Sequence, residues 1–232
     1  MILRKMIQKI IQNNMEKEVR NYEIELRADN EKNIVEGYAL LFNTPSRDLG
    51  GFIEEIEPTA LIGVLEKSDV LAVLNHDENK AVFARSRYGK GSLHLDVDEK
   101  GLRYWFKIGK SAAHQELVEM IERGDIFSSS FAFTVRDDGD KWENIGNNMY
   151  KRTISQFNEL YDVSPVYRPA YNETTVGKRS MDIIEKLKKE EQDKIDNDTQ
   201  RQEQERLEKE KREKELQDYY NGLEDIIQGF KK

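Results

Sequence analysis

The side chains best suited to proton transfer are the chain's three histidines, His76, His94 and His114, which lie far apart in the sequence. An imidazole titrates near neutral pH, so it serves as a general base, a general acid or a metal ligand. His94 stands between two leucines, which predicts the solvent side of a strand, and His114 belongs to the first turn of a predicted helix. His76 differs because it follows the apolar run 70–74, at a strand end, where a rigid scaffold commonly presents functional side chains.

A nucleophile for such a histidine is offered by three consecutive serines, Ser128, Ser129 and Ser130, which lie among phenylalanines. Hydroxyl groups buried among aromatic rings are costly unless they are hydrogen-bonded. One interpretation is that these hydroxyls bond to the backbone at a strand edge. The other is that one of them attacks an acyl carbon after a histidine takes its proton. In an extended strand, Ser129 points to the opposite face from its two neighbours.

A serine–histidine pair also needs a carboxylate that orients the imidazole. Asp162 lies in the apolar segment 160–166, LYDVSPV, so its carboxylate either faces water or is held inward by a partner. Glu159 and Asp77 are alternatives.

Composition excludes several other kinds of chemistry. The chain has no cysteine, which rules out disulfides, cysteine-ligated metals and thiol catalysis. Its histidines and acidic residues are not clustered at ligand spacing, so a metal-dependent hydrolase is disfavoured and neither a metal nor a cofactor is expected. The net charge of −8 disfavours nucleic acid as a partner. No run of about 18 apolar residues occurs, and residues 1–15 form no signal-peptide apolar region, so no membrane association is expected.

The elements that would position these side chains are mainly strands. Alternating or continuous apolar residues and turn signals predict one strand from Tyr22 and others at 34–42, 52–56, 70–74, 81–85, 92–97, 102–107, 126–135, 150–157 and 158–166. Helices are predicted at 58–66 and 111–123, the second with Ser111 as its N-cap and Gly124 as its C-cap. The pattern predicts a strand-dominated α+β fold or a β-barrel.

Three regions follow from composition: an N-terminal amphipathic helix at 1–20, a globular domain at 21–178 and a charged extension at 179–232. Residues 181–232 hold 12 basic and 16 acidic residues, and residues 196–206 include no apolar residue, which disfavours a coiled coil. A charged helix and a disordered linker both remain open for this stretch. Residues 216–230 carry an apolar stripe at helical spacing, which predicts either a docking helix or packing against the globular domain.

Three segments, in this order, resemble the tailed-phage prohead maturation proteases of the HK97 type. They are 73–77 (VLNHD), 124–126 (GDI) followed by 129–133 (SSFAF), and 160–171 (LYDVSPVYRPAY). The resemblance covers roughly residues 23–176. It implies a closed β-barrel ringed by a few helices, as in the herpesvirus maturation proteases. It also implies His76, Ser130 and Asp162 as the catalytic residues. The chain departs from the family at two positions: Ser129 stands where the family often has an apolar residue, and Ala132 where it often has glycine.

The activity that the resemblance implies is that of a serine endopeptidase without a cofactor. Its substrates would be the major capsid protein with its scaffolding segment, and the chain itself. Because an exposed linker with few apolar residues can be threaded by a protease, we expect self-cleavage within about 177–200, or after the N-terminal helix. Backbone amides would stabilise the oxyanion. Arg168 is a further candidate for this role, but an ion pair with a carboxylate of the globular domain is the favoured interpretation of that residue. The place of action would be the procapsid interior in the bacterial host cytoplasm, and homo-oligomerisation is left open. The alternative is a non-catalytic capsid assembly or scaffolding protein.

Overall fold

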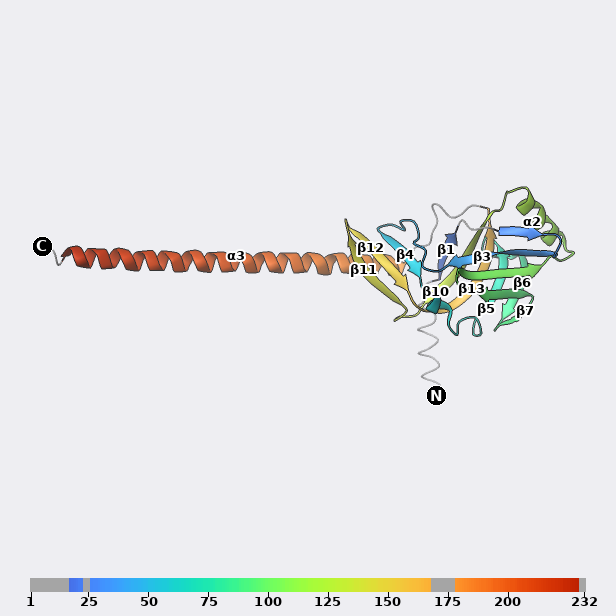
Figure 1. The fold of residues 1–232 in the computed structure, drawn as a ribbon, viewed down its shortest axis with the longest axis horizontal. Helices are drawn as coiled ribbons and strands as arrows, with labels where there is room; N and C mark the ends of the chain where they lie inside the picture. The colour runs from blue at the N-terminus through green and yellow to red at the C-terminus, as the bar shows by residue number, and fades with distance from the viewer. Residues whose placement is uncertain (1–16, 23–25, 168–177, 230–232) are drawn as a thin grey trace, which may run out of the picture. The chain divides into compact units, whose positions relative to one another are not determined.

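The computed structural model describes the backbone of residues 17–22, 26–167 and 178–229 (Figure 1). Most of the predicted N-terminal helix therefore lies outside the described residues. Residues 18–22, of which 18–20 were expected in that helix, instead form a strand. None of the described helices is long and apolar enough to span a bilayer.

The catalytic candidates lie on the largest sheet, which has six strands. Its order is β1 (Glu18–Tyr22), β10 (Ser128–Val135), β13 (Phe157–Val166), β5 (Asp69–Leu74), β6 (Asp77–Arg87) and β7 (Lys90–Gly91). All neighbours in this sheet are antiparallel except β13 and β5, which run parallel.

Two smaller sheets complete the strand-rich part of the fold. One has the order β11 (Asp140–Gly146), β12 (Met149–Ile154) and β4 (Phe52–Ile56), and the other β2 (Leu26–Asp29), β3 (Ile34–Leu41), β9 (Gly101–Lys107) and β8 (Leu93–Val97). The expected strand-dominated α+β fold is confirmed. The sequence did not reveal β11, because most of its side chains are exposed and show no apolar alternation.

The expectation of a closed barrel is wrong for the residues that the structure describes. Closure requires each strand to pair on both sides, so that no edge remains. Here the described strands form three separate sheets with end strands of their own. The large sheet and the β2–β3–β9–β8 sheet share one apolar core, in which Phe131 of β10 and Phe106 of β9 are wholly buried.

The helical predictions hold in part. Residues 58–66 form only a short 3-10 helix, Pro58–Leu61, because Gly63 adopts a left-handed conformation with φ +67°. The second helix is α2 (Ala112–Glu122), and its N-cap Ser111 accepts a hydrogen bond from the His114 amide, as expected. Its C-cap is Arg123, and Gly124 supplies the left-handed residue that follows.

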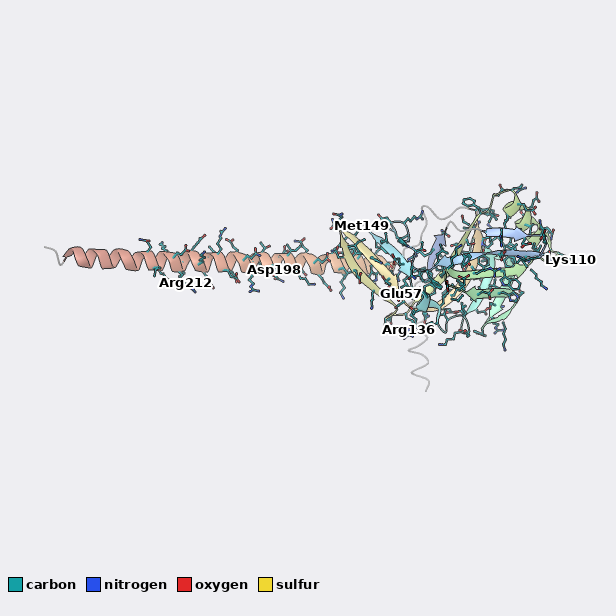
Figure 2. All side chains as sticks on the ribbon, in the orientation of Figure 1. Glu57, Lys110, Arg136, Met149, Asp198 and Arg212 are labelled. Atoms are coloured by element: carbon teal, nitrogen blue, oxygen red, sulfur yellow. The ribbon has the colours of Figure 1, made fainter. Side chains whose placement is uncertain are left out.

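The chain divides into two compact units, Met1–Met181 and Asp182–Lys232, while the predicted domain boundaries stay a prediction. Of the two alternatives for the charged extension, the structure has the helix: α3 runs from Lys178 to Gly229. Charged side chains such as Asp198 and Arg212 extend from it (Figure 2). Ion pairs at i,i+4 spacing, including Arg201–Glu205, add small increments of helix stability.

Candidate active site

The hairpin between β5 and β6 presents His76. Leu74 pairs with Asp77, which leaves Asn75 and His76 as a two-residue turn with φ values of 51° and 61°. Positive φ at both central residues defines the type I′ turn that suits a right-twisted hairpin. Asparagine and histidine are among the few non-glycine residues that adopt this conformation with any frequency. The turn therefore fixes the imidazole at the end of a buried strand.

Asn75 ties this turn to the strand that carries Asp162. The Asn75 amide donates to the Pro165 carbonyl at 3.1 Å, and the Tyr167 amide donates to Asn75 Oδ1 at 3.1 Å. Both partners lie at the end of β13 or just beyond it. The hairpin is thus held against β13 by one main-chain and one side-chain hydrogen bond.

The structure brings together the three residues that the resemblance named. His76 Nδ1 lies 2.5 Å from Asp162 Oδ1, and His76 Nε2 lies 2.5 Å from Ser130 Oγ. Because a carboxylate can only accept, the imidazole proton resides on Nδ1 and leaves Nε2 as the acceptor that faces the hydroxyl. This connectivity is the one that a serine nucleophile and its general base require.

Adjacent strands place the serine and the aspartate. β10 and β13 pair with Ser130 opposite Ser164 and Ala132 opposite Asp162. Directly opposite residues of an antiparallel pair share a face, so Ser130 and Asp162 both lie on one face of the sheet. The turn that carries His76 bridges them.

Asp162 is almost wholly buried and has three polar partners among the residues that the structure describes. Besides His76, Ser164 Oγ donates to Asp162 Oδ1 at 2.8 Å, and Lys17 Nζ lies 3.2 Å from Oδ2. Burial by itself would raise the pKa of this carboxyl, but the hydrogen bond and charge of His76, the charge of Lys17 and the hydroxyl of Ser164 hold the pKa below its ordinary value. The group is therefore a carboxylate at neutral pH.

Ser130 is wholly buried, and its single hydroxyl hydrogen has two acceptors within reach. One is His76 Nε2, and the other is the main-chain carbonyl of Arg20 in β1, to which Ser130 Oγ donates at 2.9 Å. The Arg20 carbonyl thus competes with the imidazole for the proton of the resting hydroxyl.

The alternative residues lie elsewhere. Ser129 points to the apolar core, where its Oγ lies 2.8 Å from the hydroxyl of Tyr104. Asp77 accepts a hydrogen bond from the Asn79 amide at 3.0 Å. Glu159 is paired with Thr134, farther along the β10–β13 ladder from Ser130. The imidazole of His76 contacts Asp162 and Ser130 instead.

Of the other two histidines, His94 is on the surface, as the pattern predicted, and His114 is half-buried at the rim of the core against Phe83 and Phe106. His94 on β8 stacks on Trp105, with ring centroids 3.7 Å apart, and it is exposed. His114 on α2 contacts Ser111 and lies 3.1 Å from the Phe83 carbonyl. Arg168 lies outside the described residues. Within the described part of the chain, no group of three or more histidine and acidic side chains is placed to hold a metal ion.

Sequence reasoning missed the contribution of β1. This strand supplies the Arg20 carbonyl and is preceded by Lys17, and its inward side chains enter a buried charge network. In that network, Arg20 contacts Glu18 at 2.5 Å and Glu54 at 2.9 Å, and Arg152 contacts Glu18 at 2.7 Å and Glu54 at 2.9 Å. Asp140 completes it, 2.8 Å from Arg152. Residues 17–22 gave no signal of their own, because Val19 and Tyr22 are three positions apart and do not alternate, and the apolar spacing further upstream suggested a helix.

Buried charges of this kind fix β1 in place. The network joins β1 to β4, β11 and β12, so one ion cluster connects the large sheet to the three-stranded sheet. Losing one partner of such a cluster leaves an uncompensated buried charge, which typically costs about 3–5 kcal/mol.

Comparison with protein families gives one match of direct relevance. The family model of the caudovirus prohead serine protease matches residues 18–189, a span that begins with β1 and includes His76, Ser130 and Asp162. Comparisons with curated proteins and with solved structures give no match. The matched span covers more than half of the chain and confirms the resemblance found in the sequence. This chain belongs to the caudovirus prohead serine protease family.

Proposed function

We propose that this chain is a capsid maturation endopeptidase in which Ser130 is the nucleophile, His76 the general base and Asp162 the residue that orients the imidazole. The observation that supports this assignment is the continuous contact from Ser130 Oγ through His76 to Asp162, at 2.5 Å on each side of the ring. Family membership supports the reaction class, which is peptide hydrolysis by a serine.

The first half of the proposed reaction forms an acyl-enzyme. Ser130 Oγ attacks the peptide carbonyl carbon while His76 Nε2 takes the hydroxyl proton, and the carbonyl electron pair moves onto oxygen. The imidazolium then gives that proton to the leaving nitrogen as the C–N bond breaks. Asp162 stays ionised and stabilises the imidazolium, in keeping with its lowered pKa.

The second half releases the acyl group. A water molecule takes the place of the departed amine, His76 accepts its proton, and the hydroxide attacks the ester carbonyl of acylated Ser130. Collapse of this intermediate returns the proton to Ser130 Oγ. No cofactor takes part in either half.

The direction of substrate entry follows from the pairing of β10. This strand is paired with β1 on one side and β13 on the other, so a peptide cannot add beside Ser130 as a further strand. It must approach from the face of the sheet that carries Ser130 and Asp162. Because Ser130 is wholly buried, groups on that face have to move before a peptide reaches its Oγ.

The proposed substrates are the major capsid protein with its scaffolding segment and the chain itself, in the procapsid interior of the host cytoplasm. For self-cleavage, the window at about 177–200 coincides largely with α3, which begins at Lys178. A helical segment has to unfold locally before it can be cut, so cleavage here would be slower than at an extended segment. The other proposed site follows the predicted N-terminal helix, and there residues 18–22 form a strand rather than a helix.

The test is cleavage of the capsid protein encoded by the same phage, followed by intact-mass analysis. Wild type should produce discrete fragments, whereas Ser130→Ala should produce none. Ser129→Ala is the matched control, because its hydroxyl faces Tyr104 rather than His76, and it should still cleave. Loss of cleavage in Ser129→Ala alone would assign the nucleophile to Ser129. Equal cleavage by all three proteins, or an intact substrate with wild type, would favour the non-catalytic assembly role.

A further inference from the structure

The nucleophile has a second neighbour that the proposed reaction does not yet use. β1 pairs with β10 so that Asn21 lies directly opposite Ser130. Side chains of directly opposite residues share one face, with Cβ atoms about 4.5–5.5 Å apart. The contact of Lys17 with Asp162 also places Asn21 on this face, because Lys17 and Asn21 are four residues apart and alternate residues of a strand point to the same side.

Strand order puts Asn21 on the flank of Ser130 that faces away from the aspartate. The order β1–β10–β13 places Ser130 between Asn21 on one side and Ser164 and Asp162 on the other. His76, which contacts Asp162, therefore approaches Ser130 from the β13 side. An oxyanion donor belongs on the side of the nucleophile opposite its general base, and this is the position of Asn21.

The amide of Asn21 lacks the partners that a buried polar group normally has. Its Oδ1 is buried without a hydrogen-bond partner, although the residue as a whole is only half-buried. Ser128 Oγ, which shares the same face of β10, is also buried without a partner. Unsatisfied polar atoms are rare in native proteins, so their presence beside a nucleophile calls for a functional explanation.

The side chains on the opposite face of β1 hold the strand, and with it Asn21, in a fixed position. Glu18 and Arg20 point away from Asn21 and enter the buried network with Glu54 and Arg152. This anchoring holds the strand in register beside Ser130. A donor contributes most to catalysis when it is held in place before charge develops.

We propose that the side-chain amide of Asn21 is an oxyanion donor of this protease. As Ser130 Oγ bonds to the carbonyl carbon, Asn21 Nδ2–H donates a hydrogen bond to the oxygen that becomes negative, and no proton is transferred. This inference rests on the proposed function, because the oxyanion arises only if Ser130 is the nucleophile. It makes β1 a part of the catalytic site.

The experiment uses the full chain and p-nitrophenyl acetate, a small ester whose hydrolysis passes through the same kind of oxyanion. Removal of one oxyanion donor lowers kcat about 100- to 1,000-fold in a serine protease. Asn21→Ala should lower kcat by that factor and leave KM within about twofold, since the donor acts on the transition state rather than on the bound ester. The isosteric Asn21→Asp, which replaces the donor by a carboxylate, should lose at least as much.

Controls separate the outcomes. Asn158→Ala removes another amide of the same sheet, one that bonds to Thr134, and should keep wild-type kcat. Urea unfolding midpoints of both Asn21 variants should match wild type, which excludes loss of fold. Wild-type kcat in folded Asn21→Ala, or a loss in Ser128→Ala instead, would overturn the inference while leaving Ser130 in its role. A wild type no faster than Ser130→Ala would contradict the proposed function itself, and the inference would fall with it.

Discussion

His76 has a left-handed backbone conformation, with φ 61°, which few residues other than glycine adopt. A left-handed non-glycine residue costs about 1–3 kcal/mol, and the surrounding structure must hold it there. Here the holding contacts are those of Asn75, which is left-handed too, with the Pro165 carbonyl and the Tyr167 amide. Backbone strain at this turn thus serves to place a functional group between two strands.

Replacement of Asn75 tests this account. Asn75→Ala should lower the free energy of unfolding by about 1–3 kcal/mol, because alanine disfavours the left-handed conformation and leaves the Tyr167 amide without its acceptor. Urea denaturation measures the change. Asn75→Asp is the matched control, since it keeps Oδ1 and tolerates positive φ, and it should lose much less. Equal losses in the two variants would show that the side-chain acceptor has no role in the turn.

The lowered pKa of Asp162 predicts a dependence of stability on pH. A carboxyl whose pKa is lower in the folded than in the unfolded state stabilises the fold at pH above its unfolded value of about 3.9, and this contribution is lost as the pH falls through the folded value. Asp162→Asn should therefore flatten the acid limb of the stability curve, as measured by urea unfolding between neutral and acidic pH. If the free energy of unfolding of Asp162→Asn fell with decreasing pH as steeply as that of wild type, the lowered pKa of Asp162 would not be a source of the pH dependence.

At the scale of the element, β1 has two working faces. One carries Lys17 and Asn21 beside the candidate catalytic residues, and the other carries Glu18 and Arg20 into the buried ion network. Arg152 is the centre of that network, because it contacts Glu18, Glu54 and Asp140 and is itself buried.

Arg152→Ala should be strongly destabilising. It removes one of the two arginines that pair with Glu18 and Glu54 and leaves these buried carboxylates to Arg20, so the expected loss is about 3–5 kcal/mol in the free energy of unfolding. Arg123→Ala provides the comparison, since its ion pairs with Glu119 and Asp125 are exposed and screened by solvent, so the loss should be much smaller. Calorimetric or urea unfolding of both proteins checks this. Similar losses in the free energy of unfolding for the two variants would contradict a major contribution of the buried ion network to stability.

Strands and helices could be predicted where their burial requires apolar residues at regular spacing in the sequence. β5 and β10 were found because their runs are apolar, and α2 because its N-cap and spacing agree. β1 was not, because it pairs with β10, which is distant in the sequence, and β11 was not, because most of its side chains are exposed and show no apolar alternation. The three catalytic candidates came from a resemblance to a family, whereas the role of Asn21 needed the register between β1 and β10.

At the scale of the molecule, the chain combines a strand-rich unit with a second unit, Asp182–Lys232, that is helical to Gly229. Every residue of the candidate triad belongs to the first unit. The charged helix therefore has no direct part in the proposed chemistry, and recruitment into the forming capsid is the role that we propose for its apolar end segment.

Deletion of residues 182–232 should leave ester hydrolysis within about twofold of wild type, because His76, Ser130 and Asp162 all belong to the unit Met1–Met181. The same deletion should abolish incorporation of the protein into procapsids, as measured by mass spectrometry of purified particles. Replacement of the segment by a charged helix without the apolar stripe controls for length. Normal incorporation of the truncated protein would reject the recruitment role.

The central claim is that Ser130 is a nucleophile activated by His76, and the most direct measurement is covalent labelling with a fluorophosphonate. The full chain should gain one adduct by intact mass, and peptide mapping should locate it on Ser130. The labelling rate should fall at least about 100-fold in His76→Ala, because general-base assistance is commonly worth that factor or more. An adduct on another serine, or equal labelling rates in wild type and His76→Ala, would contradict the account.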